Sequence, residues 1–230
     1  MNTTLNTTSE KLRRLTAVAM FCALSYICMF VFRIKVSFLT FDAKDAVTAT
    51  GAMFFGPLSA LVISAVVAVL ELITVSDTGY YGCIMNFISS AAFSVTASLI
   101  YKYRRKLSGA ILGLGSAVVA MTACMMAANL LITPYYMGVS VSDVRAMIPT
   151  LLLPFNLTKA FFNASLVLLL YKPVTRALRA TGLVHMPSHE TRAKGRKTTI
   201  MIAIIAAVLI LSSILVFMIL LNGQFELYRT

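Results

Sequence analysis

Long apolar runs without a charged residue alternate along this chain with short, polar and mostly basic segments. Charge-free runs cover, among others, residues 78–101, 107–142 and 200–221. A helix needs about 20 apolar residues to cross the hydrocarbon core of a bilayer, so each run is long enough to span one. The alternating segments of ~10 residues that mark a membrane β-barrel are absent from the sequence. The pattern predicts an all-α integral membrane protein.

Glycine, proline and charged residues divide the apolar runs into seven predicted helices. We expect these helices at residues 15–32, 46–55, 58–75, 82–101, 108–132, 154–171 and 200–221. The first six would form one membrane domain over residues 1–175. A basic cytoplasmic linker would follow over residues 176–199, and residues 200–230 would contain an additional transmembrane helix.

The second and third predicted helices are short, because Gly56-Pro57 interrupts a stretch that is barely long enough for two spans. A single span is the alternative. Cytoplasmic segments carry an excess of Lys and Arg, and two spans place the basic segments 1–14, 102–106 and 172–199 on one side. A single span would put the last two outside. We therefore predict two short helices, which membrane proteins tolerate where protein surrounds them, and a cytoplasmic N-terminus.

The composition agrees with this class of protein. Hydrophobic residues make up 59% of the chain and charged residues 12%, whereas about a quarter of a soluble domain is charged. The net charge of +12 does not indicate a nucleic-acid partner, because the basic residues lie between apolar spans. The four cysteines show no metal-ligand or disulfide spacing. The first apolar run lacks a following small-x-small cleavage site, so we expect it to remain as a helix in the plasma membrane.

Several polar residues fall inside the predicted helices, toward the half that would face outside. They are Asn86, Asn129, Asn156, Lys159 and Asn163, with Glu71 as a weaker candidate at a helix end. Spacings of three and four place the three from the sixth helix on one face. Polar groups at membrane depth tend to face the bundle interior, so the set could converge on one pocket. Two other interpretations stay open: each amide can bond only a neighbouring helix, and Lys159 can extend to the interface.

Catalytic arrangements are missing from the sequence. The two histidines, His185 and His189, lie in the basic linker. We find no His/Glu metal pair, no Ser-His-Asp arrangement and no GxxxxGK[ST] phosphate loop. We therefore expect no enzyme activity, no cofactor and no metal site, and any ATP hydrolysis would fall to another chain.

The first predicted helix carries a pair of small residues, Ala19 and Ala23, extended by Cys22 and Ser25. Small residues at this spacing let a second helix approach closely. The partner could be another helix of the same bundle or a helix of another subunit.

Five segments resemble, in this order, the substrate-binding S components of energy-coupling-factor (ECF) transporters, and specifically the riboflavin type. They are the helix with Ala19 and Ala23, the acidic loop 38–45 (FLTFDAKD), the junction 51–58 (GAMFFGPL), the segment 78–87 (TGYYGCIMNF) and the segment 153–159 (LPFNLTK). The resemblance covers about residues 11–175, and the last segment is the most specific.

The resemblance implies a six-helix bundle with a vitamin pocket open to the outside and a lid formed by the loop after the first helix. By match to the family's binding positions, the ligand would contact Leu39, Asn86, Asn129, Asn156 and Lys159. Ala19 and Ala23 would dock on a transmembrane coupling subunit, and two cytoplasmic ATPases would drive release inside.

Riboflavin fits these residue types. Its flat ring has one edge with alternating carbonyl and N–H groups, which carboxamides and a lysine can bond. Phe38, Phe41, Phe87 and Phe155 could supply apolar or stacking walls. The chain departs from the family in two places: Cys83 stands where an acid is common, and the seventh helix exceeds the six-helix pattern.

Other functions are distinguished by simple observations. An S component for another vitamin or heterocycle would not quench flavin fluorescence. A small membrane enzyme, such as a lipid transferase, would show substrate turnover. A facilitator that needs no ATPase would support uptake when the coupling subunit and ATPases are absent.

Overall fold

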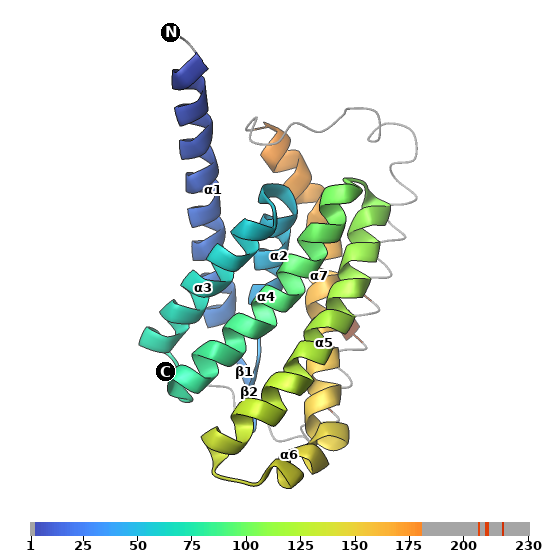
Figure 1. Ribbon diagram of the computed structural model, residues 1–230. Coiled ribbons are helices and arrows are strands. Elements are labelled where there is room, and N and C mark those ends of the chain that lie inside the picture. The colour runs from blue at the N-terminus through green and yellow to red at the C-terminus, as the bar shows by residue number, and fades with distance from the viewer. Residues whose placement is uncertain (1–2, 181–206, 208–209, 212–217, 219–230) are drawn as a thin grey trace.

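The computed structural model describes residues 3–180 and the single positions 207, 210, 211 and 218. The elements are α1 (Thr3–Val31), β1 (Ile34–Val36), β2 (Leu39–Phe41), α2 (Lys44–Phe55), α3 (Pro57–Thr74), α4 (Gly79–Tyr103), α5 (Leu107–Met137), α6 (Val141–Met147), the π-helix η1 (Ile148–Leu152) and α7 (Leu153–Ala180). The long helices α1, α3, α4, α5 and α7 run lengthwise through one bundle (Figure 1). The predicted transmembrane helix at 200–221 and the linker beyond Ala180 lie outside the described ranges.

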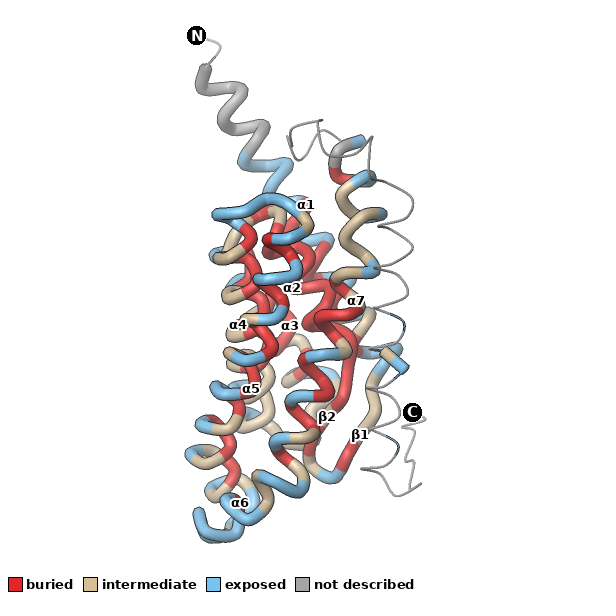
Figure 2. Tube along the Cα trace, turned by 90° about the vertical axis from the view of Figure 1, so that its right-hand side faces the viewer, coloured by how far each residue is buried: buried red, intermediate tan, exposed pale blue. Residues whose placement is uncertain are grey.

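Among the residues that the structure describes, five segments are long and apolar enough to cross a membrane. They are Lys11–Val31, Pro57–Thr74, Gly79–Tyr103, Leu107–Met137 and Val141–Leu178. The shorter α2 lies among the other elements and is buried along almost its whole length (Figure 2). The prediction of an all-α membrane bundle is confirmed.

The break at Gly56-Pro57 separates α2 from α3, as the sequence predicted. Gly56 has a φ of 96°, a conformation that side chains of other residues disfavour. Pro57 then begins α3, where its missing N–H leaves no bond unmade. The chain reverses direction here, and the guanidinium of Arg14 donates to the last carbonyl of α2, that of Phe55 (2.5 Å).

Two regions expected as loops have regular structure. Residues 34–41 form an antiparallel hairpin in which Val36 pairs with Leu39, and its apolar side chains pack on Val144, Leu152 and Phe155. The predicted loop at 133–146 contains the end of α5 and most of α6. Helix α5 continues through Pro134 to Met137, and Ser140 and Asp143 form a capping box that starts α6. Local capping and the cluster of apolar side chains, rather than hydrophobic period, organise these segments.

The helices α4 and α5 pack closely because small residues lie between them. A Cβ atom added to Gly113 would lie 2.9 Å from the carbonyl oxygen of Ala97. The core between α2, α4, α5 and α7 is filled by large side chains such as Phe93, Leu114 and Met121, each at most 2% exposed.

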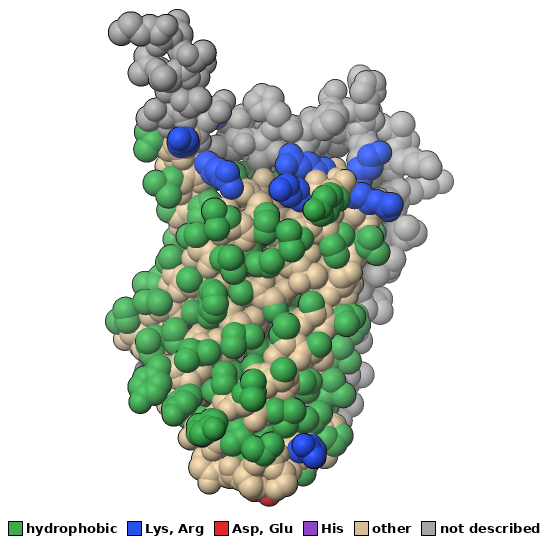
Figure 3. Space-filling model, in the orientation of Figure 1, with side chains coloured by type: hydrophobic (Ala, Val, Ile, Leu, Met, Phe, Trp, Pro, Cys, Tyr) green, Lys and Arg blue, Asp and Glu red, His purple; other side chains and the backbone are tan. Residues whose placement is uncertain are grey.

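Basic side chains gather at one end of the bundle, and apolar side chains cover its flanks (Figure 3). The basic end contains the turn between α4 and α5 with Arg104, Arg105 and Lys106, the start of the apolar part of α1, and the last turns of α7. The opposite end contains α6, the hairpin, the start of α4 and the end of α5 (Figure 1).

Candidate ligand-binding site

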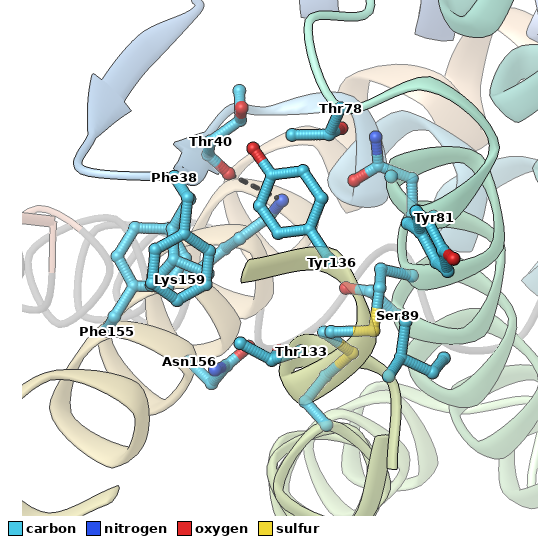
Figure 4. Close-up of a pocket in the computed structure, with 16 residues that line it drawn as sticks. Phe38, Thr40, Thr78, Tyr81, Ser89, Thr133, Tyr136, Phe155, Asn156 and Lys159 are labelled. Atoms are coloured by element: carbon cyan, nitrogen blue, oxygen red, sulfur yellow. Dashed lines mark hydrogen bonds between the residues drawn. The ribbon is translucent and has the colours of Figure 1, made fainter. Parts of the chain in front are cut away.

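A cavity opens at the end of the bundle opposite the turn between α4 and α5. The hairpin, the start of α4, the end of α5 and the start of α7 all contribute to its wall (Figure 4). The lining residues are Phe38, Leu39, Thr40, Thr78, Tyr81, Gly82, Met85, Asn86, Ser89, Met125, Ile132, Thr133, Tyr136, Phe155, Asn156 and Lys159.

The structure brings four of the five predicted ligand contacts to this cavity: Leu39, Asn86, Asn156 and Lys159. Asn129 does not line it. Its amide is fully buried, donates to the carbonyl of Met125 (2.7 Å) and accepts from the hydroxyl of Thr133 (2.9 Å). Thr133 borders the cavity, so Asn129 positions a lining residue instead of facing the cavity itself.

The side-chain amides of Asn156 and Asn86, which both line the cavity, differ in how many hydrogen bonds they already make. The NH₂ group of Asn156 donates to the carbonyl of Leu152 (2.8 Å), one turn earlier in the same helix. The side chain of Asn86 has no hydrogen bond to any other described residue, and it is half-buried. An amide offers two donors and an acceptor, so Asn86 has both kinds of group available for a ligand.

Lys159 lies on α7 and is 3% exposed. Its ammonium group donates to the carboxylate of Asp42 (2.9 Å) and to the carbonyl of Thr40 (3.1 Å). Figure 4 shows the second bond at the edge of the cavity. The side chain therefore does not extend to the interface but has a buried acidic partner, one of the alternatives left open by the sequence.

Two further charged residues are buried. One is Lys44, from the acidic loop 38–45, and the other is Glu71, the weaker candidate at a helix end. They are 1% and 4% exposed and form an ion pair with each other. The hairpin and α2 bring Lys44 beneath α3, a tertiary contact that hydrophobic patterning cannot reveal.

Asn163 has a structural role, next to Lys159 on α7. Its carbonyl oxygen accepts from the backbone N–H of Ala46 (2.8 Å), and its NH₂ group donates to the backbone carbonyl of Asp42 (3.1 Å). The first N–H groups of a helix have no partner within the helix. Asn163 supplies such a partner for an N–H group of α2, and so holds the N-terminus of α2 against α7.

Aromatic side chains form much of the cavity wall. Phe38 and Phe155 line it as expected, whereas Phe41 packs behind Phe155 with ring centroids 6.2 Å apart, and Phe87 is not a lining residue. Tyr81 and Tyr136 also line the cavity, although neither was expected there from the sequence.

Tyr81, Met85 and Ser89 recur at intervals of four, and residues four apart share a helix face. This spacing in the sequence could have identified the face of α4 that lines the cavity. Cys83, where the sequence departs from the riboflavin type, lines neither this cavity nor the adjoining one described next.

A second, more polar cavity adjoins the first and shares six lining residues with it: Phe38, Leu39, Thr40, Thr78, Asn86 and Tyr136. Arg33, Lys35 and Asp77 form its outer wall, where Asp77 pairs with both basic side chains.

The small residues on α1 divide between two faces. Ala19 and Ala23 are exposed on the outside of the bundle. Cys22 and Ser25 are buried, and the hydroxyl of Ser25 donates to the backbone carbonyl of Lys44 (3.0 Å). Cys22 and Ser25 therefore pack inside the bundle, and only the alanine pair remains open to another protein.

The comparisons with known proteins agree on one family. A family profile described as "ECF transporter, substrate-specific component" matches residues 13–171. A protein named riboflavin transporter RibU from Staphylococcus aureus (strain TCH60) is 27% identical over 178 residues, which cover 73% of this chain and 93% of that protein. One named riboflavin transporter FmnP from Bacillus subtilis (strain 168) is 26% identical and covers 71% and 94%.

A solved structure shows the same architecture. It is described as the structure and mechanism of the S component of a bacterial ECF transporter, and it matches with a TM-score of 0.63 and 26% identity. The match covers 74% of this chain and 99% of that one. The chain therefore belongs to the substrate-specific components of ECF transporters, as a multi-pass membrane subunit that binds the importer's substrate.

Proposed function

We propose that this chain captures riboflavin on the outer face of the membrane and delivers it inward together with a coupling subunit and two ATPases. The observation that carries the ligand assignment is the cavity itself: aromatic rings face amide and ammonium groups within one chamber. The names of the two relatives, both riboflavin transporters, support the same ligand.

The cavity offers what an isoalloxazine ring needs. Phe38, Tyr81, Tyr136 and Phe155 supply flat apolar surface. The imide edge of the ring presents two carbonyl acceptors around one N–H donor. The free amide of Asn86 can bond both kinds of group, and Lys159 at the opposite wall can donate to a carbonyl.

Fluorescence titration tests the ligand. Riboflavin added to the purified full chain in detergent should lose fluorescence saturably with a stoichiometry of one. Asn86→Ala should weaken binding on the order of tenfold, the effect of about 1.4 kcal/mol from one lost hydrogen bond. Lys102→Ala, on the same helix at the basic end, is the control and should bind like the wild type. A folded protein that leaves flavin fluorescence unchanged would reassign the substrate to another vitamin.

The proposed docking surface is the exposed face of α1 around Ala19 and Ala23. A tryptophan there would hold a partner helix away without entering the bundle. Ala19→Trp and Ala23→Trp should keep riboflavin binding but abolish ATP-driven uptake in vesicles that contain the coupling subunit and ATPases. Val119→Trp, at an exposed position of α5 (68% exposed), is the matched control. Normal uptake by both alanine variants would move the docking surface elsewhere.

A further inference from the structure

Five ionisable side chains lie buried directly behind the ligand cavity. They are Asp42, Lys44, Asp45, Glu71 and Lys159, each at most 4% exposed. Two ion pairs account for four of them: Lys159 with Asp42, and Lys44 with Glu71. Three acids and two bases leave the cluster one negative charge in excess if all five are ionised, and the group left over is Asp45.

Asp45 has no exposed surface. One carboxyl oxygen, Oδ1, accepts a hydrogen bond from the hydroxyl of Ser90 on α4. The other, Oδ2, has no hydrogen-bond partner, and within residues 3–180 the carboxyl group takes part in no ion pair. Burying an ionised carboxylate without a partner is disfavoured by several kcal/mol.

The start of α2 does not provide the missing partner, although Asp45 lies in its first turn. The N–H of Lys44 donates to Asp42 Oδ1 (3.1 Å), and the N–H of Ala46 donates to Asn163 Oδ1 (2.8 Å). The helix dipole alone contributes up to ~2 kcal/mol, less than the penalty of burying the charge.

We propose that Asp45 is a proton-binding site and holds its proton in the folded, ligand-free protein. The cluster is then neutral, with two ion pairs and one uncharged acid. The charged groups that act on Asp45 are Asp42 before α2, Lys44 on α2 and Lys159 on α7, while α4 contributes the Ser90 hydroxyl. Lys159 also lines the cavity and pairs with Asp42. The Lys159–Asp42 ion pair therefore lies between the proton on Asp45 and the bound ligand, whatever that ligand is.

Infrared spectroscopy of the purified full chain tests the site. A protonated carboxyl group absorbs apart from carboxylates and shifts when H₂O is replaced by D₂O. The chain has only 8 Asp and Glu residues, so one band can be assigned. The wild type should show this band at neutral pH and Asp45→Asn should lack it. Asp77→Asn, at a half-exposed, paired aspartate, is the matched control and should retain the band. Absence of the band from the wild type, or its survival in Asp45→Asn, would overturn the proposal.

Thermal unfolding gives a second measurement that separates a proton from a bound cation. Asparagine reproduces the uncharged carboxyl group in size and shape, so Asp45→Asn should unfold within a few degrees of the wild type. Exchange of sodium for choline in the buffer should leave both unchanged. A wild-type unfolding temperature that rises with sodium, and an Asp45→Asn protein that ignores sodium, would show that a metal ion and not a proton balances the charge.

Discussion

The ammonium group of Lys159 faces in two directions, toward the cavity and toward the carboxylate of Asp42. Its bonds to Thr40 and Asp42 tie α7 to β2 and to the short segment between β2 and α2. Removing one partner of a buried ion pair leaves the other charge uncompensated, which typically destabilises a protein by about 3–5 kcal/mol. A loss of ligand affinity in a Lys159 variant would therefore have two causes, damage to the fold and damage to the site.

A double substitution separates the two effects. Lys159→Met should lower the stability of the protein toward SDS by about 3–5 kcal/mol, since Asp42 loses its closest partner. Lys159→Met combined with Asp42→Asn should restore most of that stability, because neither charge remains. Riboflavin titration should still show weakened binding in the double variant. Full affinity there would remove Lys159 from the ligand contacts and leave it a structural residue.

At the scale of elements, small residues decide how closely the helices pack. Gly51 on α2 faces the ring of Phe21 on α1, and an added Cβ would lie 2.8 Å from it. Gly113 on α5 meets the backbone of α4 in the same way, at the carbonyl of Ala97. A backbone atom cannot move aside as a flexible side chain can, so the α4–α5 contact depends on Gly113 having no side chain.

Two glycines on α5 provide a matched pair for this contact. Gly113→Leu should destabilise the protein by about 1–3 kcal/mol or more, the usual penalty of overpacking. Gly115→Leu should change stability little, because its Cβ would meet nothing within 4 Å. Thermal unfolding of the two variants in the same detergent makes the comparison. Equal losses in the two variants would mean that the close approach of α4 to Gly113 does not explain the effect.

For the whole molecule, the basic end and the cavity lie at opposite ends of the bundle (Figures 1 and 3). Basic segments are retained on the cytoplasmic side of a membrane. From this arrangement we expect the cavity to open to the outside, which capture of an external substrate would require.

Cysteine labelling in cells tests the orientation. In a background without the four native cysteines, Ser142→Cys in α6 should react with a membrane-impermeant maleimide in intact cells. Arg105→Cys, in the turn between α4 and α5, should react only after the membrane is permeabilised. Both positions are exposed. The reverse pattern would open the cavity to the cytoplasm and contradict the proposed direction of transport.

The sequence alone was sufficient for the features that depend on local composition. Apolar run lengths identified the helices, Gly56-Pro57 separated α2 from α3, and spacing on α7 brought Asn156 and Lys159 to one face. These predictions succeed because lipid surrounds the chain. The bilayer directly sets the length and the hydrophobicity that each membrane-spanning helix must have.

Only the tertiary structure decided which polar groups meet. The partner of Lys159 is Asp42 and that of Lys44 is Glu71, both far away in sequence. Asn129 lies behind the cavity, and Tyr81 and Tyr136 lie in its wall. Ion pairs and cavity walls form between segments that only folding brings together. A hydrophobic period gives the face of each helix, but it does not give the helix that packs against that face.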